Sequence, residues 1–340
     1  ACTASVPWKS AIGCHALQKV PVMLRPAPYF LRGSMQSVHF EKIKSWFSLS
    51  RPAFHTVGIL PFILGTILAY KINLVFDPAV FALGVSAVIL IMLSTYHMGE
   101  YFDYREDEIS QRLYKSRFAG GSGVVPAKTV KRSVALRTGL ISFIIAGIIG
   151  LTLQFILKTG PYTLLLGCLG AFPGFFYSTQ PVRLVQKGVG EIFIGFCYGW
   201  LPVASAYYIQ TGFVHSVIHW ITVPIGLTIF NVIFLNEYPD YEADKATGKK
   251  NLLYRLGKRK GKVLFFVFSL LASTAVFSSP VFGVPFKAVY LYLPVAIVSL
   301  FIAVMMLRDQ YENRKTMELL CGLNIAVNLG TSLVYILAYI

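Results

Sequence analysis

Charged side chains are scarce in this chain. Only 14% of its 340 residues are charged, whereas 55% are hydrophobic, a balance that excludes an ordinary soluble domain. The long apolar runs are continuous and do not alternate with polar residues, which argues against transmembrane β-strands. A bilayer core takes about 20 apolar residues per helix. Runs of that kind occur nine times, at roughly 53–71, 78–98, 133–157, 161–178, 188–209, 216–236, 262–282, 287–308 and 317–340. The sequence therefore predicts an all-α polytopic membrane protein, a bundle of about nine transmembrane helices.

Cysteine is also scarce, and its spacing excludes the common metal and disulfide frameworks. The five Cys residues form no CxxC pair, so neither a zinc ribbon nor a disulfide-stapled domain is expected. Three of the five, at positions 168, 197 and 321, fall inside predicted spans. A thiol packs there as a small apolar group.

Acidic residues are about half as common as basic ones, with 15 Asp and Glu against 31 Lys and Arg and a net charge of +16. The basic residues are divided unequally between alternate loops. One set of loops carries 20 Lys and Arg, and the opposite set carries only Lys71, Lys158 and Lys287. By the positive-inside rule the first set is cytoplasmic. Membrane topology therefore explains the basic charge, and we predict no nucleic-acid partner.

The first 40 residues contain four basic residues, no acidic residue and no starting Met. We expect residues 1–40 to be a targeting segment or another extension outside the core, and residues 41–340 to form the membrane domain. At its start, Phe40, Ile43 and Phe47 recur at helical spacing. This pattern predicts a short helix on the bilayer surface, with a solvated linker as the alternative.

Two stretches repeat one acidic pattern where the second and sixth spans end. They read GEYFDYRED at 99–107 and NEYPDYEAD at 236–244. In each, an Asp follows a Glu by three positions and a second Asp follows by four more, so one helix would carry all three carboxylates on one face. The first stripe is Glu100, Asp103 and Asp107, and the second is Glu237, Asp240 and Asp244. Solubility at a helix end explains a single stripe equally well, whereas two matching stripes favour a function. Both stripes border basic loops, so we expect both on the cytoplasmic side.

Carboxylates crowded on one face repel one another and require cations. Oxygen ligands suit Mg²⁺, which binds one or two protein carboxylates and keeps positions for phosphate oxygens and water. His and Cys are absent from the motifs apart from nearby His97, which disfavours zinc. Two Mg²⁺ ions would bridge the stripes to a diphosphate. The loops after the motifs add Lys115, Arg117, Lys249 and Lys250, although topology explains any one of these equally well. We therefore predict a Mg²⁺-dependent diphosphate site.

The paired motifs resemble those of the UbiA superfamily of intramembrane aromatic prenyltransferases. That family's first motif is Asn-Asp-x-x-Asp-x-x-x-Asp, and a matching set follows its sixth span. The matches are Asp103 and Asp107, with Glu100 in place of the first Asp, and Asp240 and Asp244, preceded by Asn236 and Glu237. The family's leading Asn falls on Gly99, which has no side chain to bind with, so the first metal's ligand set departs from the pattern there.

The resemblance extends over about residues 45–340. The sequence RPAFHTVGILPFILGTILAY resembles the family's first span, FFYSTQPVRLVQKGVGE its fourth connection, and DKATGKKNLLYRLGK its sixth loop. Within the superfamily, GGSG and QKGVGE look most like the branch that contains the 1,4-dihydroxy-2-naphthoate prenyltransferases.

This resemblance implies transfer of a polyprenyl group from an isoprenoid diphosphate to a lipophilic aromatic acceptor, in quinone or related lipid biosynthesis. Diphosphate would leave between the two stripes. The catalytic residues would be Asp103, Asp107, Asp240 and Asp244, and the metal ligands would be these four residues with Glu100 and Glu237. Asn236 and the aromatic rings of Tyr104 and Tyr241 would contact substrate; anchoring at the membrane interface is the other role for these tyrosines. For Arg183 we favour a topological role over contact with diphosphate. Glu191 either orients the acceptor or simply begins a helix.

Two other classes of function use the same features. An intramembrane terpene cyclase or diphosphate hydrolase would keep the metal site and need no aromatic acceptor. A cation-coupled transporter would place its carboxylates near the bilayer midplane, whereas these stripes lie at span ends.

Overall fold

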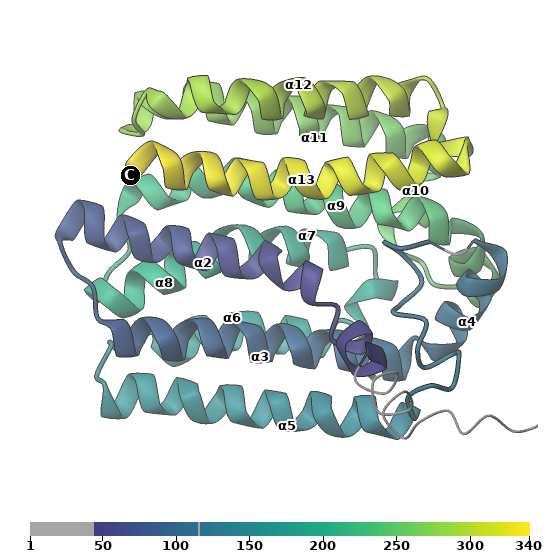
Figure 1. Cartoon of the computed structure of the whole chain (residues 1–340), viewed down its shortest axis with the longest axis horizontal. Coiled ribbons are helices and arrows are strands. Elements are labelled where there is room, and N and C mark those ends of the chain that lie inside the picture. The colour runs from purple at the N-terminus through teal and green to yellow at the C-terminus, as the bar shows by residue number, and fades with distance from the viewer. Residues whose placement is uncertain (1–43, 115) are drawn as a thin grey trace, which may run out of the picture. The chain divides into compact units, whose positions relative to one another are not determined.

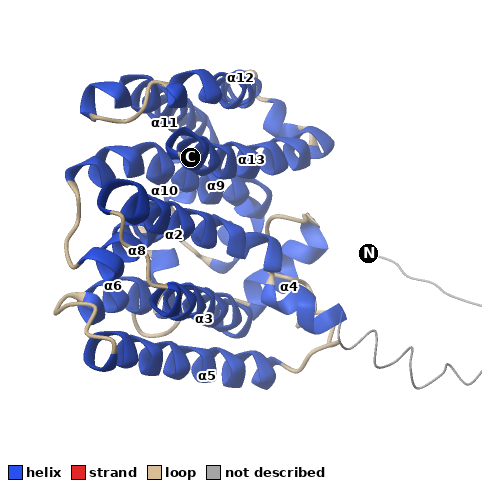
Figure 2. Ribbon diagram, turned by 60° about the vertical axis from the view of Figure 1, so that its left-hand side comes forward, coloured by secondary structure: helices blue, strands red, loops and turns tan. Residues whose placement is uncertain are grey.

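The structure, a computed structural model, describes residues 44–114 and 116–340. The predicted extension at 1–40 and the predicted diphosphate ligand Lys115 lie outside these residues. Over the described ranges all regular secondary structure is helical and no strand occurs (Figure 2). Residues 44–50 are helical, in agreement with the end of the predicted surface helix, and its Trp46 and Phe47 side chains are exposed.

The long helices are α2 (Pro52–Asn73), α3 (Pro78–Phe102), α5 (Arg132–Leu151), α9 (Ser216–Thr247), α11 (Lys258–Ser278), α12 (Lys287–Leu307) and α13 (Arg314–Tyr339). The shorter ones are α4 (Tyr104–Leu113), η1 (Thr152–Ile156), α6 (Thr163–Phe175), η2 (Leu184–Gln186), α7 (Gly190–Gly195), η3 (Phe196–Trp200), α8 (Leu201–Thr211), α10 (Leu252–Leu256), η4 (Ser279–Phe282) and η5 (Gln310–Glu312). Helices α5 and η1 run on as one span, as do α7, η3 and α8.

Eight helices in the described part are long and apolar enough to cross a membrane. The remaining predicted span, the fourth in order at 161–178, is the apolar helix α6, which is only 13 residues long. It ends early because the chain turns at Phe176 and Tyr177. Large apolar side chains such as Ile141, Ile144 and Ile148 point outward from α5, as a lipid-facing surface requires. The protein is an all-α, multi-pass integral membrane protein, as predicted.

Local sequence explains where the helices that carry the acidic motifs begin and end. Asp77 caps α3, because its Oδ1 accepts hydrogen bonds from the backbone N–H groups of Ala79 and Val80, and Pro78 occupies the first helical position. At the far end of α9, Gly248 takes a left-handed conformation with φ of 73°, which glycine adopts without steric cost.

The first acidic stripe does not lie on one continuous helix. Helix α3 ends at Phe102 and α4 begins at Tyr104, with Asp103 between them at φ −92° and ψ 16°. Backbone hydrogen bonds continue on both sides of this residue, so the junction is a kink. The prediction that one continuous helix carries Glu100, Asp103 and Asp107 was therefore wrong. At this kink polar α4 leaves the axis of apolar α3. Helix α4 then packs against α9.

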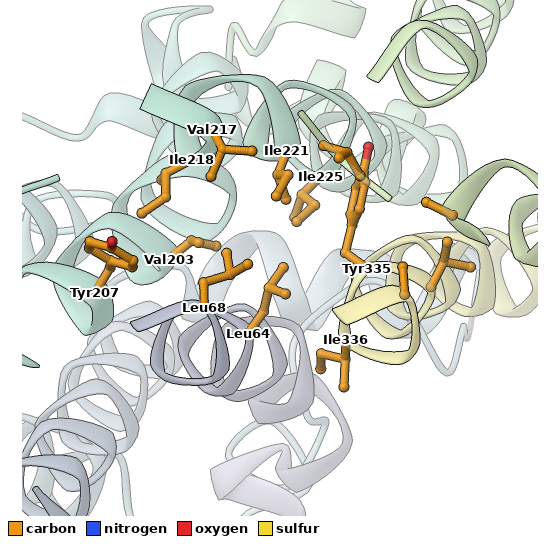
Figure 3. Packing of buried hydrophobic residues seen from close by; sticks show 14 of the residues in the cluster. Leu64, Leu68, Val203, Tyr207, Val217, Ile218, Ile221, Ile225, Tyr335 and Ile336 are labelled. Carbon is orange, nitrogen blue, oxygen red and sulfur yellow. The ribbon is translucent and has the colours of Figure 1, made fainter. Parts of the chain in front are cut away.

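The largest core cluster lies where α2, α8, α9 and α13 meet. Figure 3 shows Leu64 and Leu68 of α2 close to Val203 of α8, with Ile221 of α9 opposite. Gly65 permits this packing, because a Cβ atom there would collide with the backbone carbonyl of Val203. Helices α3, α5 and α6 pack beside this core, and α5 lies at the edge of the bundle away from α12 (Figures 1 and 2).

Candidate active site

All six predicted carboxylates line a single cavity of about 450 Å³. They come from the kinked junction of α3 and α4 and from the end of α9, two segments more than 120 residues apart in sequence. The six are Glu100, Asp103, Asp107, Glu237, Asp240 and Asp244. Asn236 also lines the cavity, and its buried Oδ1 has no hydrogen-bond partner. The structure therefore brings together the two stripes that the sequence predicted to act as one site.

The glycine-rich loop after α4 connects the two stripes. Asp240 accepts hydrogen bonds from the Ser110 hydroxyl and, at 2.9 Å, from the backbone N–H of Gly120. The backbone N–H of Ser122 donates to Glu100 Oε1 at 2.5 Å. Gly121 has φ of 66°, and a Cβ atom there would collide with the carboxylate of Asp107. Glycine at this position is therefore required both by the backbone conformation and by the space available.

Asp103 is held by the connection that follows α6. Its carboxylate accepts a hydrogen bond from the Ser178 hydroxyl and one at 2.7 Å from Arg183 Nη2, which also lies 3.0 Å from Glu106 Oε1. The Arg183 and Asp103 side chains are each only 13% exposed. Topology was the favoured role for Arg183, and the structure instead gives it two acidic partners. Its signal in the sequence was only the quoted connection FFYSTQPVRLVQKGVGE.

Lys249 lies within the acidic cluster. The left-handed turn at Gly248 brings its Nζ to 3.5 Å from Asp244 Oδ1, and Asn251 Nδ2 donates to the other oxygen of Asp244 at 2.6 Å. Burial alone would lower the pKa of Lys249, but the carboxylates of Asp244, Asp103 and Asp240 outweigh it and raise that pKa well above its ordinary value. The ammonium group is therefore charged at physiological pH.

Asp107 shows how strongly the carboxylates are crowded. Its pKa is raised well above the ordinary value, first by burial and then by the negative charges of Glu100, Asp103 and Asp240. Cations that enter such a cluster offset the repulsion between its carboxylates and stabilise it.

The donor set fits Mg²⁺. No three His, Cys, Asp or Glu side chains in the described part of the chain are already grouped as a closed metal site would require. Mg²⁺ does not need such a group, since it commonly takes one or two carboxylates and completes its shell with phosphate oxygens and water. Two ions would take two to four carboxylates, and the six around this cavity are more than that number.

Arg51 lines the cavity and was missed by the sequence analysis. Among the described residues, Arg51 and Lys249 are the two Lys or Arg side chains that line it. Arg51 precedes α2 with a left-handed backbone, φ 48°, and its guanidinium lies 4.9 Å from the ring centre of Phe54. The only signal in the sequence was its position immediately before the Pro that opens the first span.

Several predicted ligands lie outside the cavity. Lys250 and Arg117 are exposed, and Lys250 differs from Lys249 because it is one residue further round the turn. The rings of Tyr104 and Tyr241 face other cations: Arg132 at 5.5 Å and Lys258 at 4.7 Å. Helix rotation, which the sequence does not fix, separates Tyr104 and Tyr241 from the carboxylates, whereas Arg117 and Lys250 lie in loops.

Three other tyrosines line the cavity instead, namely Tyr96, Tyr177 and Tyr198. The Tyr96 hydroxyl donates to the backbone carbonyl of Phe54 at 3.3 Å. Tyr198 lies in η3, a π-helical turn, and such turns are frequent at functional sites. Glu191 does not line the cavity. Its Oε1 accepts a hydrogen bond at 2.8 Å from the Leu252 backbone N–H, so it joins two helix ends.

Beyond the tyrosines the cavity becomes apolar. It continues along α3 as far as Gly84, and its wall there is formed by α2, α5, α6 and α8. One cavity thus combines an acidic end with two cations, an aromatic middle and an apolar end.

The model of the UbiA prenyltransferase family matches residues 59–326. The chain is 28% identical over 216 residues to 1,4-dihydroxy-2-naphthoate octaprenyltransferase of Bacillus subtilis (strain 168), covering 63% of this chain and 66% of that protein. It is 28% identical over 236 residues to 2-carboxy-1,4-naphthoquinone phytyltransferase of Synechocystis sp., covering 68% and 73%. These names agree with the branch that the loop sequences resemble.

Solved structures share the fold. A UbiA homolog from Aeropyrum pernix K1 has a TM-score of 0.63 at 15% identity, covering 83% of this chain and 97% of that one. A UbiA homolog from Archaeoglobus fulgidus bound to GPP and Mg²⁺ has a TM-score of 0.59 at 14% identity, covering 84% and 99%. The family match spans well over half of the sequence and includes both acidic motifs, and the chain therefore belongs to the UbiA prenyltransferase family.

Proposed function

We propose that the protein transfers a polyprenyl group from an isoprenoid diphosphate to a lipophilic aromatic acceptor, with Mg²⁺ as cofactor and diphosphate as the second product. The observation that carries this proposal is the single cavity in which two distant acidic motifs meet and from which an apolar channel continues. The names of the naphthoate relatives and the GPP and Mg²⁺ bound to a structural neighbour support it. They also favour a hydroxynaphthoate as the acceptor.

The acidic end of the cavity would bind the diphosphate. Asp103, Asp107, Asp240 and Asp244, with Glu100 and Glu237, would hold Mg²⁺, which when bound neutralises the diphosphate and stabilises it as a leaving group. Arg51 and Lys249 would contact diphosphate oxygens directly, since they are the described basic side chains on the cavity wall. Arg183 is a positioning residue that fixes the Asp103 carboxylate.

The reaction breaks the bond between the allylic carbon and the diphosphate oxygen, and the electron pair leaves with the diphosphate. The acceptor ring supplies the electron pair for the new bond to that carbon and then loses a proton. Tyr96, Tyr177 and Tyr198 lie between the acidic and apolar parts of the cavity and would face the developing allylic cation, which aromatic faces stabilise. Their rings and the surrounding helices would also exclude water, which would otherwise give the prenyl alcohol.

The proposed orientation places both acidic motifs on the cytoplasmic side, because the loops that border them carry most of the basic residues. A transporter would need its carboxylates deep in the membrane. Glu100 instead lies two residues from the end of α3, which disfavours that alternative.

The test uses the full chain in detergent or lipid nanodiscs with labelled geranylgeranyl diphosphate, Mg²⁺ and a panel of hydroxynaphthoates and hydroxybenzoates. We expect a prenylated ring by mass spectrometry, and no product in excess EDTA. Asp240→Ala should abolish transfer, whereas Glu242→Ala should leave it unchanged, since Glu242 is exposed on the same helix and pairs only weakly with Lys258 at 3.8 Å. Prenyl alcohol or a cyclised hydrocarbon with every acceptor would instead support the hydrolase or cyclase alternative. Full activity in EDTA would refute the metal-dependent mechanism.

A further inference from the structure

Two adjacent lysines follow the second acidic motif, and only one of them enters the cavity. The Lys249 side chain is 14% exposed and lies 3.5 Å from Asp244, whereas Lys250 is exposed. The carboxylates attract an ammonium group from either position, because the attraction depends only on distance and the side chain of lysine is flexible. Charge therefore does not explain why Lys249 is the lysine inside. The path of the backbone through residues 249–252 decides it.

The start of this segment is held to the end of α9. The backbone N–H of Lys249 donates to the carbonyl oxygen of Asp244 at 2.9 Å. Two positions further on, Asn251 donates from Nδ2 to the carboxylate of Asp244 and accepts from the backbone N–H of Tyr254 at 2.8 Å. These contacts all lie within residues 244–254. They hold the segment to itself and to α9, and they do not attach it to the other helices.

Glu191, at the start of α7, attaches the segment from outside. Its side chain is buried, with the whole residue 1% exposed, and its Oε1 accepts a hydrogen bond at 2.8 Å from the backbone N–H of Leu252. Glu237 accepts from the next N–H, that of Leu253, at the longer distance of 3.3 Å. Both N–H groups belong to the first turn of α10, where a helix has no acceptor of its own for them. Glu191 therefore makes the closer of the two attachments, and it comes from a different part of the chain.

The connection that leads into α7 makes a second contact with the same segment. Arg255 of α10 donates from Nε to the carbonyl oxygen of Lys250 at 2.9 Å. Its side chain lies against Gly188, where a Cβ atom would come within 2.5 Å of Arg255 Nε. Arg183 in this same connection holds a carboxylate of the first acidic motif. One connection thus contacts the first motif at Arg183 and the segment after the second motif at its other end.

We infer that Glu191 is a positioning residue for diphosphate binding. Through the backbone of residues 250–252 it fixes the register in which Lys249, and not Lys250, enters the acidic cavity. Glu191 does not line the cavity, so it acts through the lysine and contacts neither substrate. Its hydrogen bond needs an acceptor oxygen at the right reach and does not need a negative charge. The inference rests on the proposed function for the identity of the ligand, but the placement of Lys249 is measurable without any ligand.

Lysine reactivity gives the first test. Reductive methylation of the full chain in detergent, read by tandem mass spectrometry, should modify wild-type Lys249 at least about tenfold more slowly than Lys250, because only the neutral amine reacts and the carboxylates favour the charged form. Glu191→Ala and Glu191→Asp remove or shorten the acceptor. Both should raise the reactivity of Lys249 at least about fivefold and lower that of Lys250, since either lysine can then enter the cavity.

Two controls should keep the wild-type pattern. Glu191→Gln retains an acceptor oxygen at the same reach without the charge. Glu242→Ala removes an exposed carboxylate from α9 that pairs only with Lys258 at 3.8 Å. Glu191→Asp and Glu191→Gln keep the test decisive even where Glu191→Ala does not fold. Wild-type protection of Lys249 in a folded Glu191→Asp variant would overturn the inference. Exposure of Lys249 in Glu191→Gln would also overturn it, because the charge of Glu191 would then place the lysine.

Prenyl transfer gives a second test, which separates positioning of Lys249 from a general loss of structure. Glu191→Ala, or Glu191→Asp where the first variant is unfolded, should lower kcat/KM for geranylgeranyl diphosphate at least about fivefold and leave the KM for the aromatic acceptor within about twofold. In a Lys249→Gln background the same change should lower kcat/KM by less than about twofold, because no lysine remains at position 249 to be positioned. Equal losses in the two backgrounds would show that Glu191 acts elsewhere and would overturn the inference. A wild-type chain that transfers no prenyl group but shows the expected lysine pattern would refute the proposed reaction and leave the positioning of Lys249 supported.

Discussion

Lys249 and Lys250 are adjacent in the sequence, yet only Lys249 enters the acidic cavity, so Lys249→Gln tests directly whether the cavity binds diphosphate. Two unit charges 3.5 Å apart, the distance from Lys249 Nζ to Asp244 Oδ1, attract by about 5 kcal/mol at an effective dielectric constant of 20. Desolvation of the ammonium offsets part of this, and we take about 3 kcal/mol as the net interaction lost. The diphosphate carries more negative charge than one carboxylate. The stabilisation of the transition state that is lost when Lys249 is replaced should therefore be at least as large.

A loss of about 3 kcal/mol corresponds to a decrease in kcat/KM for the donor of roughly a hundredfold. The assay is the initial rate of ring prenylation against donor concentration at saturating Mg²⁺ and acceptor. The KM for the aromatic acceptor should change little, because Lys249 lies among the carboxylates and not in the apolar part of the cavity. A thermal unfolding measurement on each variant separates loss of binding from loss of folding. We expect the Lys249→Gln variant to stay folded, because Asn251 still donates a hydrogen bond to Asp244.

Lys250→Gln is the matched control. It removes the same charge from the next residue along the chain, whose side chain is exposed. The value of kcat/KM should stay within about twofold of wild type, as expected for a screened surface charge. Equal losses in the two variants would show that only the overall charge of the loop matters. Wild-type kcat/KM in a folded Lys249→Gln variant would refute the assignment of Lys249 to the diphosphate.

Two further predictions concern the loop and the crowded carboxylates. Gly121→Ala should lower both thermal stability and Mg²⁺-dependent activity, because the new Cβ collides with Asp107, whereas Gly212→Ala, with a similar left-handed φ of 82° and nothing within 4 Å, should cost only the backbone strain of about 1 kcal/mol; equal effects of the two changes would contradict a tight contact with Asp107. In metal-free buffer, thermal stability should fall as pH rises above about 4, the ordinary pKa of an Asp carboxyl, because the raised pKa of Asp107 means that the folded state binds its proton more tightly than the unfolded state and loses this advantage when the carboxyl ionises. Saturating Mg²⁺ or Asp107→Asn should reduce this dependence, and an identical pH profile with and without Mg²⁺ would contradict cation binding at the cluster.

The structure agrees with most of the local patterns in the sequence, although the helix through the first acidic motif is broken at Asp103. Continuous apolar runs fixed the number and approximate bounds of the long helices, since burial of about 20 apolar residues in lipid outweighs other local preferences. The fourth run was the exception, because α6 is only 13 residues long. The pairing of two acidic motifs was also a local signal in each half of the chain, and their meeting in one cavity follows from two similar helix ends facing each other.

What the tertiary structure alone decided is how each side chain is turned. The kink at Asp103 moves α4 onto α9, so that Ser110 and Gly120 contact Asp240 from the opposite motif. Helix rotation places Tyr198 in the cavity and Tyr241 outside it. Composition and spacing carry the chemistry of the carboxylates, whereas these placements depend on contacts between residues more than 100 positions apart. Such contacts are set by packing of whole helices, and no single stretch of sequence specifies them.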